Sequence, residues 1–346
     1  MRALAVLLAP SVLLSMTFAG ETLAQPAVEI REWTVPWADS RPRDPYVDAQ
    51  GRVWFVGQVG DYVAMLDPQS GQFTRYDLDK GAGPHNLIVD KSGIVWYAGN
   101  RTAHIGRLDP STKAIRKIAM PDAGARDPHT LVFDPKGDIW FTVQGGGYVG
   151  KLSMADESVK LVKIPGSGTR PYGIIVDPQG RPWFNEFGTN KIGTIDPATM
   201  TLKEYDLADA GARGRRIERT SDGAVWYVDY ARGFLGRLDP ATGKAEEWVA
   251  PSGASSRPYA MIVDERDRIW YVESGVAPNQ LVGFDTKTKK VVSSTPIPSN
   301  GASRNTVRHM IYHAPTKSIW FGTDANTIGQ AKVEPSGARG RIISEE

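Results

Sequence analysis

Short runs of apolar residues, separated by tight turns, recur along most of the chain. The clearest stretch extends from Arg170 to Leu207, where the runs IIVD, PWFNE, KIGTID and LKEYDL alternate with turns such as DPQG and DPAT. Asp-Pro favours a type I turn, because proline presets φ at the second turn position, and glycine accepts the left-handed geometry of a tight hairpin. Apolar and polar residues alternate in the later runs, as in half-buried strands. The stretch therefore predicts four short strands in one sheet, which cannot bury both of its faces alone.

The same unit repeats along the chain, and a tryptophan marks its second strand. Seven of the ten tryptophans occupy this position, at intervals of 42 to 50 residues. They are Trp54, Trp96, Trp140, Trp183, Trp226, Trp270 and Trp320. A period of about 40–50 residues with four strands per unit is typical of a β-propeller. We therefore predict an all-β, seven-bladed β-propeller with four-stranded blades, in which the tryptophans pack between blades.

The two ends of the repeat region complement each other. Residues 27–36 (AVEIREWTVP) resemble the fourth strand of a repeat, whereas the last repeat, residues 306–333, has only three predicted strands. We expect the N-terminal strand to complete the seventh blade, which leaves no exposed sheet edge around the ring. The propeller then spans residues 27–333. Residues 334–346 are polar and charged, and they are predicted to form a flexible tail.

The first 24 residues have the pattern of a secretory signal peptide. Arg2 precedes an apolar, uncharged run from Ala3 to Phe18, and small residues follow it. The run is short for a stable membrane span. An uncleaved anchor is the alternative interpretation. With a cleaved signal, the mature protein is predicted to be periplasmic or secreted, with no membrane span.

Composition narrows the possible functions. The formal net charge is only +2, so no general affinity for nucleic acid or anionic membranes is expected. The chain has no cysteine, which excludes disulfides, thiol nucleophiles and thiolate metal sites. The expected partner is a small molecule bound at the mouth of the central channel, and the expected state is a monomer.

Polar residues recur where each innermost strand begins. This position is occupied in turn by Tyr46, His85, His129, Tyr172, Arg216, Tyr259 and His309. Innermost strands line the channel, so these side chains are predicted to form a polar ring at its mouth. The position three residues after each tryptophan should lie near the same mouth, and it includes Glu186, Asp229 and Glu273. Asp127 stands two residues before His129.

Imidazoles and carboxylates that converge on one opening suit a divalent metal ion or general acid–base chemistry. A concave cluster of polar groups is also the usual first hypothesis for a binding site. The alternative is structural, since such groups also bond to each other. In particular, Arg170, Arg257 and Arg308 are placed to pair with Glu186, Glu273 and Asp324.

The repeat resembles that of the virginiamycin B lyase (streptogramin lyase) family. The likeness is strongest in PYGIIVDPQGRPWFNEFGTNKIGTID, residues 171–196, and it extends over nearly all of the mature chain. The resemblance implies a seven-bladed propeller that opens a cyclic depsipeptide at its ester by elimination, without water, with Mg²⁺ at the channel mouth.

The family pattern can be placed on this chain in two ways, and neither placement is complete. In the second and third blades it meets His85, Asp127 and His129, but Val143 and Gln144 stand where a carboxylate is expected. In the sixth and seventh blades, the position that the family uses, it meets Tyr259, Val307, His309 and Asp324.

By resemblance, the first placement implies that His129 is the base and that His85 and Asp127 hold the metal, with Glu186 or Glu273 supplying the missing acid. The candidate catalytic residues are thus His85, His129 and His309. The candidate metal ligands are Asp127, Glu186 and Glu273, and the candidate substrate contacts are Tyr172, Tyr259, Arg216 and Asp229.

Three functions fit these observations. The first is a metal-assisted lyase that acts on a cyclic ester or a related molecule. The second is a metal-dependent hydrolase of the lactonase type, and the third is a binding or interaction propeller without catalysis. The fold alone does not distinguish them.

Overall fold

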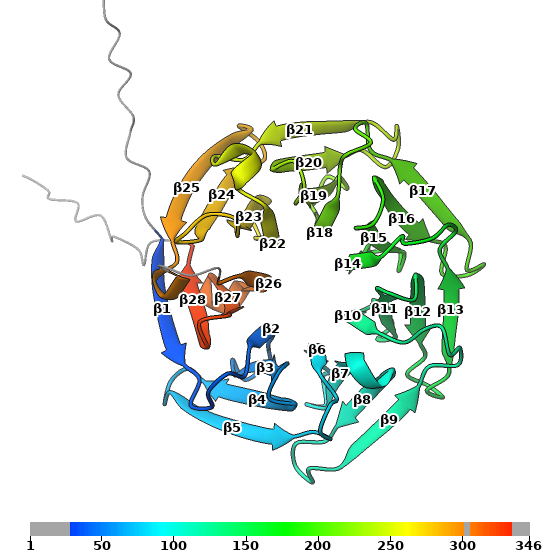
Figure 1. Cartoon of the computed structure of the whole chain (residues 1–346), viewed down its shortest axis with the longest axis vertical. Coiled ribbons are helices and arrows are strands. Elements are labelled where there is room, and N and C mark those ends of the chain that lie inside the picture. The colour runs from blue at the N-terminus through cyan, green and yellow to red at the C-terminus, as the bar shows by residue number, and fades with distance from the viewer. Residues whose placement is uncertain (1–27, 301–304, 334–346) are drawn as a thin grey trace, which may run out of the picture.

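The computed structural model describes residues 28–300 and 305–333. The predicted signal peptide, residues 1–24, and the predicted tail, residues 334–346, lie outside these ranges. No helix in the described ranges is long and apolar enough to cross a membrane. Seven four-stranded antiparallel sheets surround a central channel, as predicted (Figure 1).

Each blade begins with its innermost strand. The innermost strands are β2 (Pro42–Val47), β6 (Pro84–Val89), β10 (Pro128–Phe133), β14 (Pro171–Val176), β18 (Gly214–Arg219), β22 (Pro258–Val263) and β26 (Val307–His313). The second strands, which carry the repeated tryptophans, are β3 (Val53–Gly57), β7 (Val95–Gly99), β11 (Ile139–Val143), β15 (Pro182–Glu186), β19 (Val225–Asp229), β23 (Arg268–Glu273) and β27 (Ser318–Thr323).

The outer half of each blade is equally regular. The third strands are β4 (Tyr62–Asp67), β8 (His104–Leu108), β12 (Tyr148–Leu152), β16 (Lys191–Ile195), β20 (Phe234–Leu238), β24 (Gln280–Asp285) and β28 (Thr327–Lys332). The fourth strands are β5 (Gln72–Asp77), β9 (Ile115–Ala119), β13 (Val159–Lys163), β17 (Leu202–Asp206), β21 (Ala245–Val249), β25 (Lys290–Pro296) and β1 (Glu29–Thr34). The short 3-10 helices η1 (Asn100–Thr102), η2 (Gly253–Ser255), η3 (Pro298–Asn300) and η4 (Ala314–Thr316) lie in the connections.

The N-terminal strand closes the ring, which confirms the prediction. Strand β1 pairs antiparallel with β28, from Glu29 opposite Lys332 to Thr34 opposite Thr327. Trp33 stacks on Trp320 of the same blade, with ring centroids 5.4 Å apart. The first and last parts of the fold therefore share one sheet, shown in blue and red in Figure 1.

The repeated tryptophans are buried between blades, as predicted, and most of them are held by a residue six positions earlier. The side chains of Asp48, Asp90, Asp177 and Asp264 each accept a hydrogen bond from the indole N–H of their tryptophan. Each of these carboxylates also accepts two backbone N–H groups of the turn between the first two strands. One carboxylate thus fixes both the turn and the tryptophan of its blade.

Every innermost strand pairs irregularly with its neighbour. In β6, Pro84 lies opposite Gly99 and Leu87 lies opposite Tyr97, so a register shift separates these two pairs. The intervening residues leave the ladder and are free to turn toward the channel. The same shift in β2 puts Pro42 opposite Gly57 and Tyr46 opposite Trp54. In the first blade, Arg43 therefore occupies the position of the polar ring that His85 occupies in the second blade. The expectation that Tyr46 belongs to the ring is wrong.

We expect Asp177→Ala to destabilise the protein by about 2–4 kcal/mol, because it leaves the buried indole N–H of Trp183 and two turn N–H groups without an acceptor. Asp196→Ala is the matched control, since Asp196 also accepts backbone N–H groups of a turn but is exposed. Chemical denaturation of both variants measures the difference. Equal losses would contradict a special role for the carboxylate that binds tryptophan.

Candidate functional site at the channel mouths

The channel has two mouths of different character. We call the end at which the innermost strands begin the top mouth, and the end at which they finish the bottom mouth. Links between blades and the loops between second and third strands open at the top mouth. The turns between first and second strands open at the bottom mouth.

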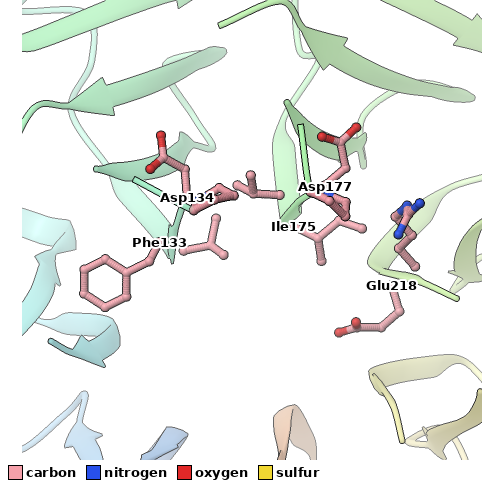
Figure 2. A pocket seen from close by; sticks show the side chains of 10 residues that line it. Phe133, Asp134, Ile175, Asp177 and Glu218 are labelled. Carbon is pink, nitrogen blue, oxygen red and sulfur yellow. The ribbon is translucent and has the colours of Figure 1, made fainter. Parts of the chain in front are cut away.

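A single carboxyl group interrupts an apolar ring near the bottom mouth. The residues paired with the repeated tryptophans are Tyr46, Ile88, Val132, Ile175, Glu218, Ile262 and Ile311. Glu218 borders a cavity of about 500 Å³ together with Val132, Phe133, Ile175 and Arg219. In Figure 2, Glu218 and Phe133 reach toward the central opening. Burial raises the pKa of Glu218 to about 8, against an opposing effect of Arg216.

At the top mouth, the structure brings the predicted ring residues together. The rings of His85 and His129 lie 3.6 Å apart between centroids, and those of His129 and Tyr172 lie 4.1 Å apart. The hydroxyl groups of Tyr172 and Tyr259 share a short hydrogen bond. These four side chains are at most 6% exposed, whereas His309 is half-buried.

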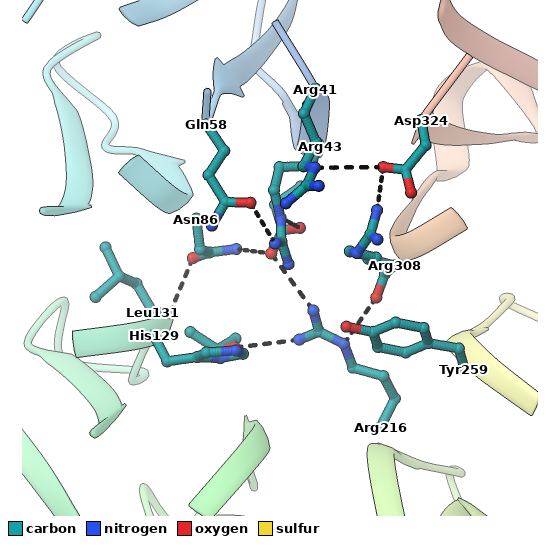
Figure 3. Close-up of polar contacts among 12 residues, drawn as sticks. Arg41, Arg43, Gln58, Asn86, His129, Leu131, Arg216, Tyr259, Arg308 and Asp324 are labelled. Atoms are coloured by element: carbon teal, nitrogen blue, oxygen red, sulfur yellow. Dashed lines mark hydrogen bonds and ion pairs between the residues drawn. The ribbon is translucent and has the colours of Figure 1, made fainter. Parts of the chain in front are cut away.

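Arg216 crosses the channel and connects four blades. Its Nε donates to the carbonyl of Arg308 at 3.0 Å, and its Nη1 donates to the hydroxyl of Thr130 at 3.1 Å. Its Nη2 lies 3.4 Å from a carboxylate oxygen of Asp44. Figure 3 shows the guanidinium group at the centre of these contacts. Arg216 is 3% exposed, so this network is inaccessible to solvent.

Asp44 is the carboxylate on which the central network converges. Arg43 Nε donates to it at 2.9 Å, and Asn86 Nδ2 donates to it at 3.2 Å. Arg43 also bonds to Gln58, and Asn86 accepts the backbone N–H of Leu131. Burial alone would raise the pKa of Asp44, but Arg43 and other cationic neighbours hold it well below its usual range. Asp44 is therefore ionised, and both of its carboxylate oxygens already have hydrogen-bond or ion-pair partners.

The three imidazoles of the ring are neutral. Burial and Arg43 lower the pKa of His85 well below its usual value, and burial and Arg216 do the same for His129. Burial and Arg216 lower the pKa of His309 to about 3. One ring nitrogen of each residue is buried without a hydrogen-bond partner, namely Nδ1 of His85, Nε2 of His129 and Nδ1 of His309. Arg43 Nη2 is buried without a partner as well.

The predicted carboxylates do not face this ring. Glu273 accepts the backbone N–H and the hydroxyl of Ser252 in the link before its blade. Asp229 accepts the N–H groups of Arg213 and Ala231. Both side chains are fully buried, so they hold links between blades rather than line the mouth.

Glu186 and Asp127 are also occupied elsewhere. Glu186 accepts the hydroxyl of Thr189, and burial and the nearby Glu204 raise its pKa to about 7. Asp127 accepts the N–H groups of Gly145 and Gly146 in the loop of its own blade. The structure therefore does not bring Asp127, Glu186 and Glu273 together.

Asp324, the acid that matches the family position in the seventh blade, is ion-paired with Arg308, and Arg41 lies 3.8 Å from the same oxygen. This contact matches the structural alternative raised for Arg308 and Asp324. No such pairs are present for Arg170 with Glu186 or Arg257 with Glu273 in the described part of the chain.

These groups do not fit a magnesium ion. Mg²⁺ favours oxygen ligands, above all carboxylates and water. Among the residues that the structure describes, no cluster of three or more histidine, aspartate or glutamate side chains is placed to hold a metal ion. Asp44 already contacts two arginines, and their charge opposes a second cation.

Sequence reasoning missed Arg43, Asp44 and Arg215. The first two were hidden because Pro45-Tyr46 imitates the Pro-His and Pro-Tyr pairs of other blades, whereas Pro42 is the structural equivalent. Arg215 was missed because it precedes the ring position by one residue. Charge was the available signal, since Arg215 and Arg216 are adjacent at the start of β18.

We expect Arg216→Met to destabilise the protein by about 3–5 kcal/mol, because it removes one partner of a buried ion pair and leaves Asp44 undercompensated. The loss should be smaller in an Asp44→Asn background, where that charge is absent. Denaturation of both single variants and the double variant measures the coupling. Strictly additive losses would contradict the cross-channel ion pair.

We expect Glu218→Gln to stabilise the protein more at pH 8.5 than at pH 5. A raised carboxyl pKa means that the folded state keeps a proton that the unfolded state releases, so stability falls as pH rises from about 4.5 toward 8. The neutral amide removes this loss. Thermal melts of both proteins at the two pH values provide the comparison, with Glu246→Gln, an exposed position, as the control. A gain independent of pH would exclude this explanation.

The chain matches known proteins over nearly all of its described length. The sequence profile of the Virginiamycin B lyase family matches residues 28–333. Virginiamycin B lyase from Staphylococcus aureus is 22% identical, with a TM-score of 0.80 over 89% of this chain and 100% of that one. A streptogramin B lyase structure is 26% identical, with a TM-score of 0.78 over 88% of this chain and 97% of that one.

A more distant structure is the extracellular domain of a hybrid two-component system from B. thetaiotaomicron. It is 15% identical, with a TM-score of 0.66 over 88% of this chain and 43% of that one. That likeness shows the fold alone. A search of curated proteins finds no match. The profile match over residues 28–333 shows that this chain belongs to the virginiamycin B lyase family.

Proposed function

We propose that this chain opens a small cyclic ester or depsipeptide by elimination at the top mouth, with a protein base and arginine side chains instead of magnesium. The observation that carries the proposal is His309. It is a neutral imidazole at the family's own histidine position, and it is the one ring histidine that is only half-buried. The predicted leader supports a periplasmic or secreted site of action.

The elimination needs a base and a group that stabilises negative charge. His309 takes the proton on the carbon next to the carbonyl, and a carbon–carbon double bond forms as the alkyl carbon–oxygen bond of the ester breaks. The freed carboxylate leaves without addition of water. Arg216 and Arg43, whose positive charges act on His309, favour negative charge on the developing enolate oxygen through their field. A pKa of about 3 makes His309 a weak base, and the arginines that weaken it also stabilise the enolate.

A second function, ligand binding without cleavage, has its own support. His85 and His129 are at most 6% exposed, and Asp324 is held by Arg308. Because the two histidines are buried and Asp324 is ion-paired, these three residues favour a mouth that binds a molecule and releases it unchanged. Hydrolysis of the lactonase type receives less support, because the described residues do not form a metal cluster that would activate water.

The test uses the mature protein and a cyclic depsipeptide of the virginiamycin B class, followed by mass spectrometry with and without EDTA. We expect a ring-opened product of unchanged mass, formed equally in EDTA. His309→Ala should slow it by about 100-fold or more, the range expected for a general base. His313→Ala, on the same strand, is the control and should not change the rate.

The outcomes separate the candidate functions. A product heavier by one water indicates hydrolysis, and a reaction abolished by EDTA contradicts the metal-free proposal. An unchanged rate in His309→Ala removes His309 as the base. Binding of the intact probe with no product, measured by calorimetry, favours the binding function.

A further inference from the structure

Arg215 lies in a bowl of aromatic rings at the top mouth. Its guanidinium carbon is 3.6 Å from the ring centroid of Tyr259, 4.3 Å from that of Tyr230 and 4.6 Å from that of Phe187. Tyr172 completes the bowl at 5.1 Å. Phe187, Tyr230 and Arg215 are half-buried, whereas the two ring tyrosines lie beneath them. We call these five residues the arginine bowl.

The charge of the arginine bowl is not balanced by a carboxylate. Arg215 has no ion pair among the described residues, and its Nε is buried without a hydrogen-bond partner. The acids on the neighbouring second strands, Glu186, Asp229 and Glu273, are fully buried and accept hydrogen bonds from other residues, and Oε1 of Glu186 has no partner. Burying an unpaired cation is costly. Contacts with Tyr259 and Tyr172 offset part of this cost, and no carboxylate among the described residues pairs with Arg215 to offset the rest.

Two more arginines stand at its rim in an unusual backbone conformation. Arg170 and Arg257 precede Tyr172 and Tyr259 by two residues and have φ values of 52° and 40°. The equivalent position in the second blade is Gly83, with φ of 50°. Glycine adopts this left-handed region without cost, whereas other residues there are strained. Both arginines are exposed and lack ion pairs in the described ranges.

We propose that the arginine bowl binds the carboxylate of a small organic acid that carries a flat apolar body. The half-buried guanidinium group of Arg215 and the exposed Arg170 and Arg257 supply donors to the carboxylate, and the aromatic rings of Phe187 and Tyr230 contact the body. Guanidinium matches a planar carboxylate with two parallel hydrogen bonds. This inference rests on the proposed role of the top mouth as a small-molecule site, and it makes that molecule an anion.

The tyrosine pair provides a reporter inside the bowl. Burial alone would raise the pKa of Tyr172, but Arg215, Arg216 and Arg43 lower it to about 8. Burial and Tyr172 raise the pKa of Tyr259 to about 12. A carboxylate bound to Arg215 would neutralise part of this positive field. Titration of the Tyr172 hydroxyl, followed by ultraviolet absorption, should then move to higher pH.

The experiment measures binding of phenylacetate to the mature protein by calorimetry, beside 2-phenylethanol, its uncharged analogue, and inorganic phosphate. We expect phenylacetate to bind and the alcohol to bind about tenfold more weakly or not at all, which corresponds to one lost charge-assisted contact. Affinity should fall as salt rises. Stronger binding of phosphate than of phenylacetate would contradict an organic acid with an apolar body.

The matched variants lie at opposite ends of one strand. Arg215→Met keeps a side chain of similar length among the rings and should reduce phenylacetate affinity at least about tenfold. Arg219→Met removes another unpaired arginine of β18, at the bottom mouth, and should leave affinity unchanged. Equal losses in both variants, or equal binding of acid and alcohol, would overturn the proposal. Circular dichroism and thermal melts verify that the variants are folded.

This outcome is separable from the elimination test. Phenylacetate binding without turnover of any ester supports the arginine bowl and contradicts the elimination. Ring opening that is unaffected by Arg215→Met and by phenylacetate supports the elimination and contradicts the bowl. If phenylacetate raises the Tyr172 pKa in the unchanged protein but not in Arg215→Met, the bound anion lies in the arginine bowl.

Discussion

A contact between an aspartate that follows the innermost strand and the tryptophan of the next strand organises the first hairpin of most blades, but not of the third and seventh, where the indole N–H has no hydrogen-bond partner. In four blades the carboxylate binds the indole N–H and the turn together, as with Asp177 and Trp183. In the fifth blade, Thr220 replaces it and binds Trp226. The register shift lies at the other end of the hairpin in all seven blades, including the third and seventh, whose tryptophans lack this contact. That shift turns residues such as His85 out of the ladder and toward the channel.

Seven blades that present polar side chains to one axis create a problem of buried charge. The solution here is a network around Asp44, in which arginines from the first and fifth blades share one carboxylate. Arg216 also binds the backbone of the seventh blade, so the network joins strands that are far apart in the chain. Its geometry depends on ring closure by β1, and it therefore couples the site to the completeness of the fold.

Periodicity predicted the fold because a repeated tryptophan and repeated turns reflect local chemistry. The site was harder, since it depends on register shifts and side-chain directions that alternation does not reveal. Tyr46 follows a proline, as most of the ring residues do, but the register of β2 puts Arg43 at the ring position instead. Glu273 and Asp229 occupy the level of the mouth, yet their carboxylates bind the links between blades. The sequence therefore predicted the histidines and tyrosines that meet at the top mouth, but it misplaced Tyr46 and missed the directions of Asp229 and Glu273.

Membership of the lyase family leads one to expect a magnesium ion at the top mouth, whereas the positive charge of this mouth disfavours a cation. A magnesium site needs carboxylates with free oxygens, but both oxygens of Asp44 and Oδ1 of Asp324 contact arginines. Burial together with Arg216 and Arg43 keeps His309 neutral, and Arg215, Arg216 and Arg43 lower the pKa of Tyr172 to about 8. A cation would have to displace these contacts, whereas an anion would be attracted by the positive field and would neutralise part of it. The shared frame therefore fixes the position of the mouth, and the arginines make its charge positive.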